Sequence, residues 1–126
     1  MFAHRSFPAT ARWAGQMLDH LLLLTGELGA GAITLSGANT YAGNTTVSQG
    51  VLKLGADNAI PGGTGMGNVA VNGTLDLAGF SETINGLSGT GTVENSTGAG
   101  VYGLSVGGNS QSSTFAGKIQ NTSGTI

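Results

Sequence analysis

Cysteine is absent from this chain of 126 residues, which excludes disulfide cross-links and thiolate-based zinc sites. Charged side chains are also scarce, at 8% of the residues against roughly a quarter in ordinary globular domains. The basic residues, Arg5, Arg12, Lys53 and Lys118, are too few and too scattered to neutralise a phosphate backbone. We therefore expect no nucleic-acid partner.

Long apolar runs are missing as well. The longest, Leu21–Leu24, is far shorter than the roughly 20 residues that a membrane-spanning helix requires, so we expect no transmembrane segment. Arg5 and Arg12 precede this run, but Asp19 and His20 interrupt it. No apolar core of a secretory signal peptide therefore remains.

Glycine, in contrast, is abundant, with 24 copies in the chain. Disordered chains combine low hydrophobicity with high net charge, whereas here 39% of the residues are hydrophobic and the net charge is −2. The glycines are accompanied by Val, Ile, Leu, Thr, Ser and Asn. This composition predicts an all-β protein with many turns.

The first thirty residues differ in composition from the rest, and we place the boundary at Gly29–Gly31. Trp13, Met17 and Leu21 are spaced by four, which predicts a short helix over Ala11–Leu24. We expect residues 1–30 to be an unmatched tail, either disordered or forming a capping helix, and residues 31–126 to form one repetitive β segment.

The second region repeats a short motif in which glycine precedes alternating apolar residues. Successive copies begin at Gly31, Gly50, Gly73 and, more weakly, Gly91, at spacings of 19, 23 and 18 residues. We expect the next copy to begin at Gly124, near the end of the chain. Such spacing is typical of one turn of a solenoid.

Within each copy the second and fourth residues after glycine are apolar and the third is polar, a period of two that buries one face of a strand. The apolar positions are Ile33, Leu35, Leu52, Leu54, Leu75 and Leu77, and the polar ones are Thr34, Lys53 and Asp76. One turn cannot bury its leucines alone, but stacked turns can, with strands about 4.8 Å apart. The pattern predicts a parallel β-helix of about four turns.

The competing architecture is a β-sandwich, with Asn72-Gly73 and Asn85-Gly86 as hairpin turns. The recurrence of one motif favours the β-helix. Its register predicts that Leu52→Asp or Leu75→Asp prevents folding, because each places a charge in the core. Lys53→Glu should then be tolerated.

The stretch from Leu35 to Gly55 resembles the passenger-associated repeat of bacterial autotransporters. The residues that carry the resemblance are Leu35, Gly37, Asn39, Thr40, Tyr41, Gly43, Thr45, Val47, Gly50, Leu52, Leu54 and Gly55, with Leu75 and Leu77 at the recurring apolar positions. Asn44 and Val51 depart from the family pattern, and both suit a β turn or strand. Ser113–Asn121 resembles the segment that precedes a further copy.

The resemblance implies a right-handed parallel β-helix within a longer passenger, displayed at the bacterial cell surface or secreted, and associated with the outer membrane through a barrel outside this sequence. It implies a non-catalytic stalk that aids export, with the neighbouring turns as partners and no cofactor. One alternative is an adhesive or glycan-binding solenoid with host-surface or matrix ligands. Another is a fragment of a carbohydrate-active enzyme. Exposed strand edges at the solenoid ends predict end-to-end self-association.

Three patterns suggest chemistry, each with a simpler interpretation. Gly103-Leu-Ser105-Val-Gly107 matches a hydrolase nucleophile motif, but no His, Asp or Glu follows it. Gly62–Gly67 resembles a calcium repeat, with Gly67 where the Asp ligand would stand. Asp76 and Glu94 are the candidate acidic pair of an enzyme. We expect a strand, a corner loop and solvated charges, respectively, and therefore no catalytic or metal-binding residues.

Asn44, Asn72, Asn95 and Asn121 each begin an Asn-x-Ser/Thr sequence, the acceptor pattern for glycosylation. The abundance of Ser and Thr makes chance matches common. We expect these residues to form turns and ladders of asparagines along the solenoid.

Overall fold

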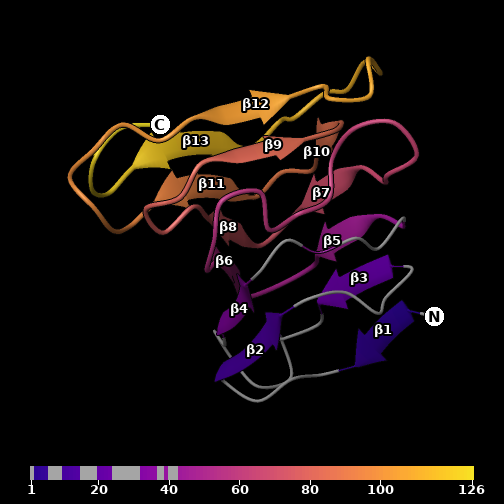
Figure 1. Ribbon diagram of the computed structural model, residues 1–126, viewed down its shortest axis with the longest axis horizontal. Helices are drawn as coiled ribbons and strands as arrows, with labels where there is room; N and C mark the ends of the chain where they lie inside the picture. The colour runs from indigo at the N-terminus through magenta and orange to yellow at the C-terminus, as the bar shows by residue number, and fades with distance from the viewer. Residues whose placement is uncertain (1, 6–9, 15–19, 24–31, 37–38, 40–42) are drawn as a thin grey trace.

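The computed structural model describes residues 2–5, 10–14, 20–23, 32–36, 39 and 43–126, and all secondary-structure elements within them are β-strands (Figure 1). The strands are β1 (Phe2–Arg5), β2 (Thr10–Ala14), β3 (His20–Leu23), β4 (Ala32–Ser36), β5 (Thr45–Val47), β6 (Val51–Leu54), β7 (Val69–Val71), β8 (Thr74–Asp76), β9 (Glu82–Ile84), β10 (Leu87–Ser88), β11 (Thr92–Asn95), β12 (Leu104–Val106) and β13 (Lys118–Asn121).

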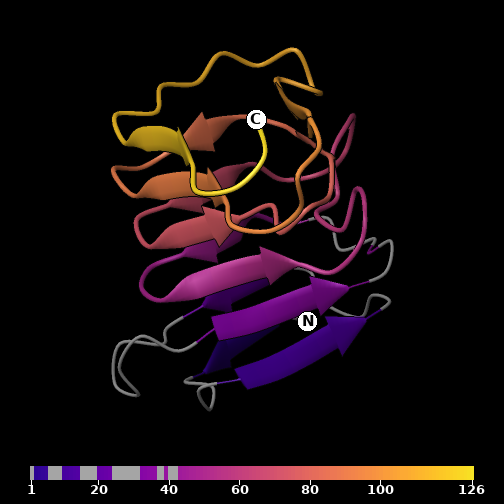
Figure 2. The ribbon, with the colours of Figure 1, turned by 90° about the vertical axis from the view of Figure 1, so that its left-hand side faces the viewer.

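The strands form three parallel sheets that the chain visits in turn. One sheet has the order β1-β3-β5-β7-β10, the second β13-β11-β8-β6-β4-β2, and the third pairs β12 with β9. Figure 2 shows the strands of successive turns stacked above one another. Because all strand pairs are parallel and the two larger sheets take strands from successive turns, the molecule is a parallel β-solenoid. The predicted all-β fold is confirmed, and hairpin pairing is excluded for these strands.

The pairing register follows the glycine-led repeat. Leu52 of β6 lies opposite Ile33 on one side and Leu75 on the other, and Val93 lies opposite Leu75. Residues at equivalent positions of the repeat therefore stack in one column, which buries each leucine against the next turn. The interior consists of Leu35, Val47, Leu52, Leu54, Ala59, Ile60, Val69, Val71, Leu75, Leu77, Ile84, Leu87 and Val93.

The glycines that begin each repeat also form a column, for which the close approach of the turns is the physical reason. A Cβ atom on Gly73 would lie 2.6 Å from the carbonyl oxygen of Gly50. A Cβ on Gly91 would collide with the carbonyl oxygen of Gly73, and one on Gly117 with that of Gly91. Only glycine fits where the backbones of consecutive turns meet this closely.

The expected start of the next copy at Gly124 is wrong. The strand that continues the second sheet is β13, in which Ile119 lies opposite Val93, and Gly117 continues the glycine column. The chain between β11 and β13 is longer than in the earlier turns. The next glycine of the column is therefore Gly117, which precedes the expected Gly124.

The short helix expected over Ala11–Leu24 is also wrong for the described residues of that range. They lie in β2 and β3, which pair in parallel with β4 and β5. A spacing of four returns to the same face of a strand as well as to that of a helix, so the spacing did not discriminate between them. Met17 lies outside the described residues. Strands on both sides of Gly29–Gly31 share sheets, and the division of the chain there stays a prediction.

Candidate functional site

Asparagine side chains connect successive turns at the corners. Asn39 is buried and its Nδ2 donates to the carbonyl oxygen of Ala59 at 2.8 Å. Asn44 Oδ1 accepts from the backbone N–H of Asn68, whose own Oδ1 accepts from that of Gly86, both at 2.9 Å. Asn72 Oδ1 accepts from Thr90 N–H at 3.1 Å. Asn44 and Asn72 thus lie at corners, as the sequence predicted, and their side chains bond to the backbone of the next turn.

Asn95 and Asn121, the last residues of β11 and β13, also bond to the backbone, Asn95 across turns and Asn121 within its own segment. Asn95 is fully buried; its Oδ1 accepts from Gly79 N–H at 2.7 Å and its Nδ2 donates to Ser123 O. Asn121 Oδ1 accepts from Ile126 N–H at 2.8 Å. Each side chain therefore satisfies backbone groups that corners leave without a sheet partner.

The expectation that Asp76 is a solvated outer-face charge is wrong. Its side chain is 2% exposed, and Oδ1 accepts from the N–H groups of Ala78 and Ser96 at 2.9 and 3.0 Å. Oδ2 accepts from Ser96 Oγ and lies 3.9 Å from Lys53 Nζ. Glu94 is its register partner, but Glu94 Oε2 accepts from Thr122 Oγ1 at 2.8 Å. Asp76 is thus occupied with structural bonds, which leaves no free acid–base pair.

Glu82 on β9 is a buried acid that sequence reasoning missed. It is 2% exposed, Oε2 accepts from the Ile60 N–H at 3.2 Å, and Oε1 has no hydrogen-bond partner among the described residues. Burial raises the pKa of Glu82 to about 7, and the negative charge of Asp57 adds to this rise. Side chains alternate along a strand, so Glu82 lies on the same face as the apolar Ile84 and opposite to Thr83. This alternation is the sequence signal that could have predicted an inward Glu82.

Asn85, just after β9, holds the loop of residues 61–68. Asn85 is fully buried, and its Oδ1 accepts from Gly63 N–H at 2.6 Å. Its Nδ2 lies 3.0 Å from the carbonyl oxygens of Gly63, Met66 and Gly67. A single amide thus fixes both ends of this loop against the next turn.

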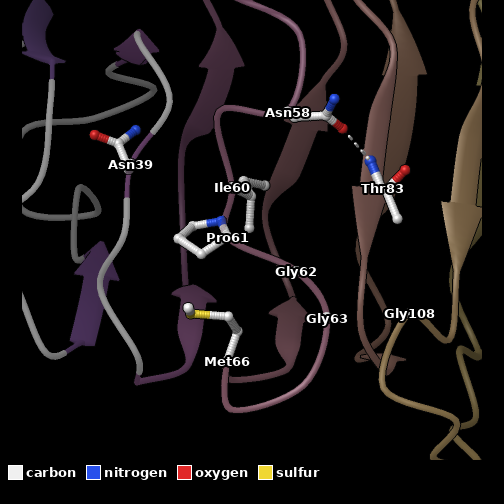
Figure 3. A pocket seen from close by; sticks show the side chains of 9 residues that line it. All are labelled: Asn39, Asn58, Ile60, Pro61, Gly62, Gly63, Met66, Thr83 and Gly108. Carbon is white, nitrogen blue, oxygen red and sulfur yellow. Dashed lines mark hydrogen bonds between the residues drawn. The ribbon is translucent and has the colours of Figure 1, made fainter.

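Beside this loop the surface is hollowed into a groove of about 430 Å³. Asn39, Asn58, Ile60, Pro61, Met66 and Thr83 contribute side chains to its walls, together with the backbone of three glycines. Figure 3 places Ile60, Pro61 and Met66 in the middle of the view, with Asn39 on one side and the hydrogen-bonded Asn58 and Thr83 on the other. The groove therefore crosses several turns.

The remaining motifs appear as structural parts. Ser105 lies in β12 opposite Thr83, and its side chain is exposed. Gly62–Gly67 forms part of the loop held by Asn85. The described residues contain no group of three or more His, Cys, Asp or Glu side chains able to hold a metal ion. Nor does the described part of the chain contain a helix that is long and apolar enough to cross a membrane.

The repeat residues between Leu35 and Gly55 divide between core and corner. Leu35, Thr45, Val47, Leu52 and Leu54 are buried, as are Leu75 and Leu77 further along. Gly43, Gly50 and Gly55 are half-buried, and Gly50 has a φ of 74°. Gly37, Thr40 and Tyr41 lie outside the described residues.

Residues 28–54 match the family model of the passenger-associated-transport-repeat. This segment is a passenger-associated transport repeat. The chain is also similar to the adhesin BmaC autotransporter of Brucella suis biovar 1 (strain 1330), with 42% identity over 114 residues. That match covers 87% of this chain and 3% of the relative, so the chain spans a small part of the length of that relative. No solved structure matches it. The repeat includes β4, β5 and β6, and it contributes Leu35, Val47, Leu52 and Leu54 to the core.

Proposed function

We propose that this chain is a structural, non-catalytic stalk segment of an autotransporter-type passenger that is displayed at the bacterial cell surface or secreted. The observation that carries the proposal is the register: Leu52 lies between Ile33 and Leu75 of the adjacent turns. Each turn that stacks buries the apolar face of the one before it. Folding can therefore advance turn by turn, and a folded stack outside the cell opposes backward movement of the chain during export.

The acidic residues support the absence of catalysis. Asp76 is buried in four structural contacts, and Glu94 bonds to Thr122. Glu82 is enclosed beneath the surface of the solenoid. General acid–base chemistry requires a carboxyl group within hydrogen-bond reach of a bound substrate. Asp76 and Glu82, each 2% exposed, are enclosed away from such a substrate.

Surface display tests the proposal. The full chain, carrying an N-terminal epitope, is fused to an autotransporter translocation domain, and the epitope is measured on intact cells. Leu52→Asp places an unpaired charge in a fully buried column and should reduce display severalfold. Thr46→Asp is the matched control, because Thr46 lies on the outer side of β5 between two buried residues. Normal display of Leu52→Asp would refute a role for stacking in export.

An adhesive role is the second candidate, favoured by the similarity of the chain to an adhesin. The two roles are separable by experiment. If the chain is only a stalk, a surface substitution that leaves it folded retains display. If the chain is adhesive, such a substitution can abolish the attachment of displaying cells to host cells or matrix without any loss of display.

A further inference from the structure

The groove lies where the lengths of neighbouring corners differ. Eight residues, 61–68, separate Ile60 from β7, whereas only Asn85 and Gly86 separate β9 from β10. One turn later the chain is long again, with residues 107–114 between β12 and the bridge at Phe115. Two long loops therefore flank a short corner, and the groove forms beside them.

We propose that this groove is a binding site for an uncharged oligosaccharide that lies across successive turns of the solenoid. The proposal goes beyond the stalk function and does not depend on it. If the solenoid served only to bury its leucines, short corners such as Asn85-Gly86 would be sufficient. The longer loops add ordered backbone whose entropy cost the core does not require.

The groove is already formed in the free chain. The first loop is fixed by the four contacts of the Asn85 amide, and its contact with the neighbouring turn is close: a Cβ on Gly62 would lie 2.6 Å from the carbonyl oxygen of Thr83. The second loop is joined to the first, because Asn109 Nδ2 donates to Asn68 Oδ1 at 3.3 Å. Because these walls are fixed before binding, a ligand does not have to order them, and the entropy cost of binding is lower.

The chemistry of the walls selects the ligand. Among the described residues that line the groove no side chain is charged, so a charged ligand would lose hydration without gaining a partner there. Asn58 is exposed and uses its Oδ1 to accept from Thr83 N–H at 3.1 Å, while no described residue accepts from its Nδ2. Asn58 Nδ2 and the exposed Thr83 hydroxyl are thus available for ligand oxygens.

Apolar side chains complete the match. Met66 is half-buried and lies near Pro61 in the middle of the opening (Figure 3). A sugar ring presents C–H groups on its faces and hydroxyls around its edge, so it covers apolar side chains while it bonds to amides and hydroxyls. A peptide that adds as a strand to a free sheet edge is disfavoured. β12 pairs with one edge of β9, and Asn58 occupies the other, because its Oδ1 accepts from Thr83 N–H and its N–H donates to Ser81 O.

The test titrates the full chain with free maltotriose, cellotriose and mannotriose, and follows backbone amide shifts by NMR. The prediction is saturable shifts at Gly63, Thr83 and Gly108 with at least one of these sugars. Asn58→Asp keeps the acceptor oxygen and replaces the free Nδ2 donor, and should weaken binding roughly tenfold. Met66→Ser should weaken binding too, whereas Met66→Leu should retain it.

Asn72→Asp is the matched control, because Asn72 is also exposed and also accepts a backbone N–H of the next turn at 3.1 Å. It should bind as the parent chain does, and circular dichroism verifies that all variants are folded. The proposal is overturned if no trisaccharide gives saturable shifts, or if Asn58→Asp binds as tightly as Asn72→Asp. Shifts caused by an uncharged Ser/Gly/Thr peptide, with none from the sugars, would overturn it as well.

Discussion

The backbone N–H of Ile60 donates a hydrogen bond to Oε2 of Glu82 at 3.2 Å, and this bond joins two consecutive turns through a carboxyl group inside the solenoid. The other oxygen of that carboxyl has no partner among the described residues. Burial disfavours its charged form most strongly, and the negative charge of Asp57 acts in the same direction. Nearby backbone N–H groups, chiefly that of Ile60, oppose the shift but do not cancel it.

Stability should therefore decrease as the pH rises through about 7. The pKa of Glu82 is raised from about 4.5 to about 7 in the folded chain, so folding favours the protonated form. This contribution is fully present below about pH 4.5 and is lost as the pH rises through about 7. A shift of this size corresponds to about 3 kcal/mol. Urea unfolding between pH 5 and pH 9 measures it.

Glu82→Gln is the control for this effect. Glutamine keeps the size of the side chain and an acceptor for Ile60 N–H but does not ionise in this range. The free energy of unfolding of this variant should change little between pH 5 and pH 9. An equal decrease in the parent chain and in Glu82→Gln would assign the pH dependence to another group.

Lys53 and Asp76 give a second prediction, one that corrects the expectation from sequence that Lys53→Glu is harmless. The register places Lys53 opposite Asp76, and their charged atoms are 3.9 Å apart. Asp76 is buried, whereas the Lys53 side chain is 42% exposed. Lys53→Glu would put a second negative charge beside a carboxylate that cannot move into solvent.

We expect Lys53→Gln to cost less than about 1 kcal/mol, as is usual for the loss of a partly exposed ion pair. Lys53→Glu should cost more than this, and added salt should reduce the difference by screening the repulsion. Thermal unfolding at low and high ionic strength compares the two variants. Equal stabilities at low salt would show that the two side chains do not interact in solution.

The repeat explains how much of this fold the sequence could predict. Leu52 and Leu75 identified the strand, its buried face and its register, because one physical requirement, burial between turns, acts at every copy. The same logic failed at Gly124, because the motif alone does not tell which Gly-led segment stacks on the previous turn. The segment that stacks is β13, which follows Gly117. It also failed at Ala11–Leu24, where a spacing of four fits a strand as well as a helix.

The groove was harder to predict than the core. Its walls come from Asn39, from Asn58 and Met66 on the next turn, and from Thr83 on the turn after that, and these residues share no local motif. The buried Asn85 that fixes one wall looked like a hairpin turn, because Asn-Gly is the usual signal for one. The neighbouring turn determines which backbone groups an asparagine side chain can bond to. A local sequence pattern contains no information about that turn.

Ala78 provides a test of backbone strain. It has a φ of 52°, a left-handed conformation that disfavours residues with a Cβ, and its N–H donates to Asp76 Oδ1 at 2.9 Å. Ala78→Gly should raise the free energy of unfolding by about 0.5 kcal/mol, because relief of the strain exceeds the entropy that glycine adds to the unfolded chain. Ala70→Gly, within β7, should lower it by a similar amount. Destabilisation by both would show that Ala78 is not strained.

Asn85 should be the polar residue whose loss most affects the long loop. In Asn85→Ala the carbonyl oxygens of Gly63, Met66 and Gly67 and the N–H of Gly63 all lose a partner at a fully buried side chain. We expect a cost of about 2–3 kcal/mol, typical of buried polar groups left unsatisfied. Limited proteolysis should find new cleavage sites within residues 61–68, because the loop is released before the core unfolds.

Asn85→Asp distinguishes the hydrogen bonds from the volume of the side chain. Aspartate fills the same space and can still accept from Gly63 N–H, but it has no donor for the three carbonyl oxygens and turns a negative charge toward them. It should therefore destabilise the chain at least as much as alanine at neutral pH, and recover part of that loss in acid, where the carboxyl can donate. Asn72→Ala, which breaks one bond at an exposed corner, should leave the loop resistant. Aspartate as stable as asparagine would mean that the amide donor is not what holds the loop.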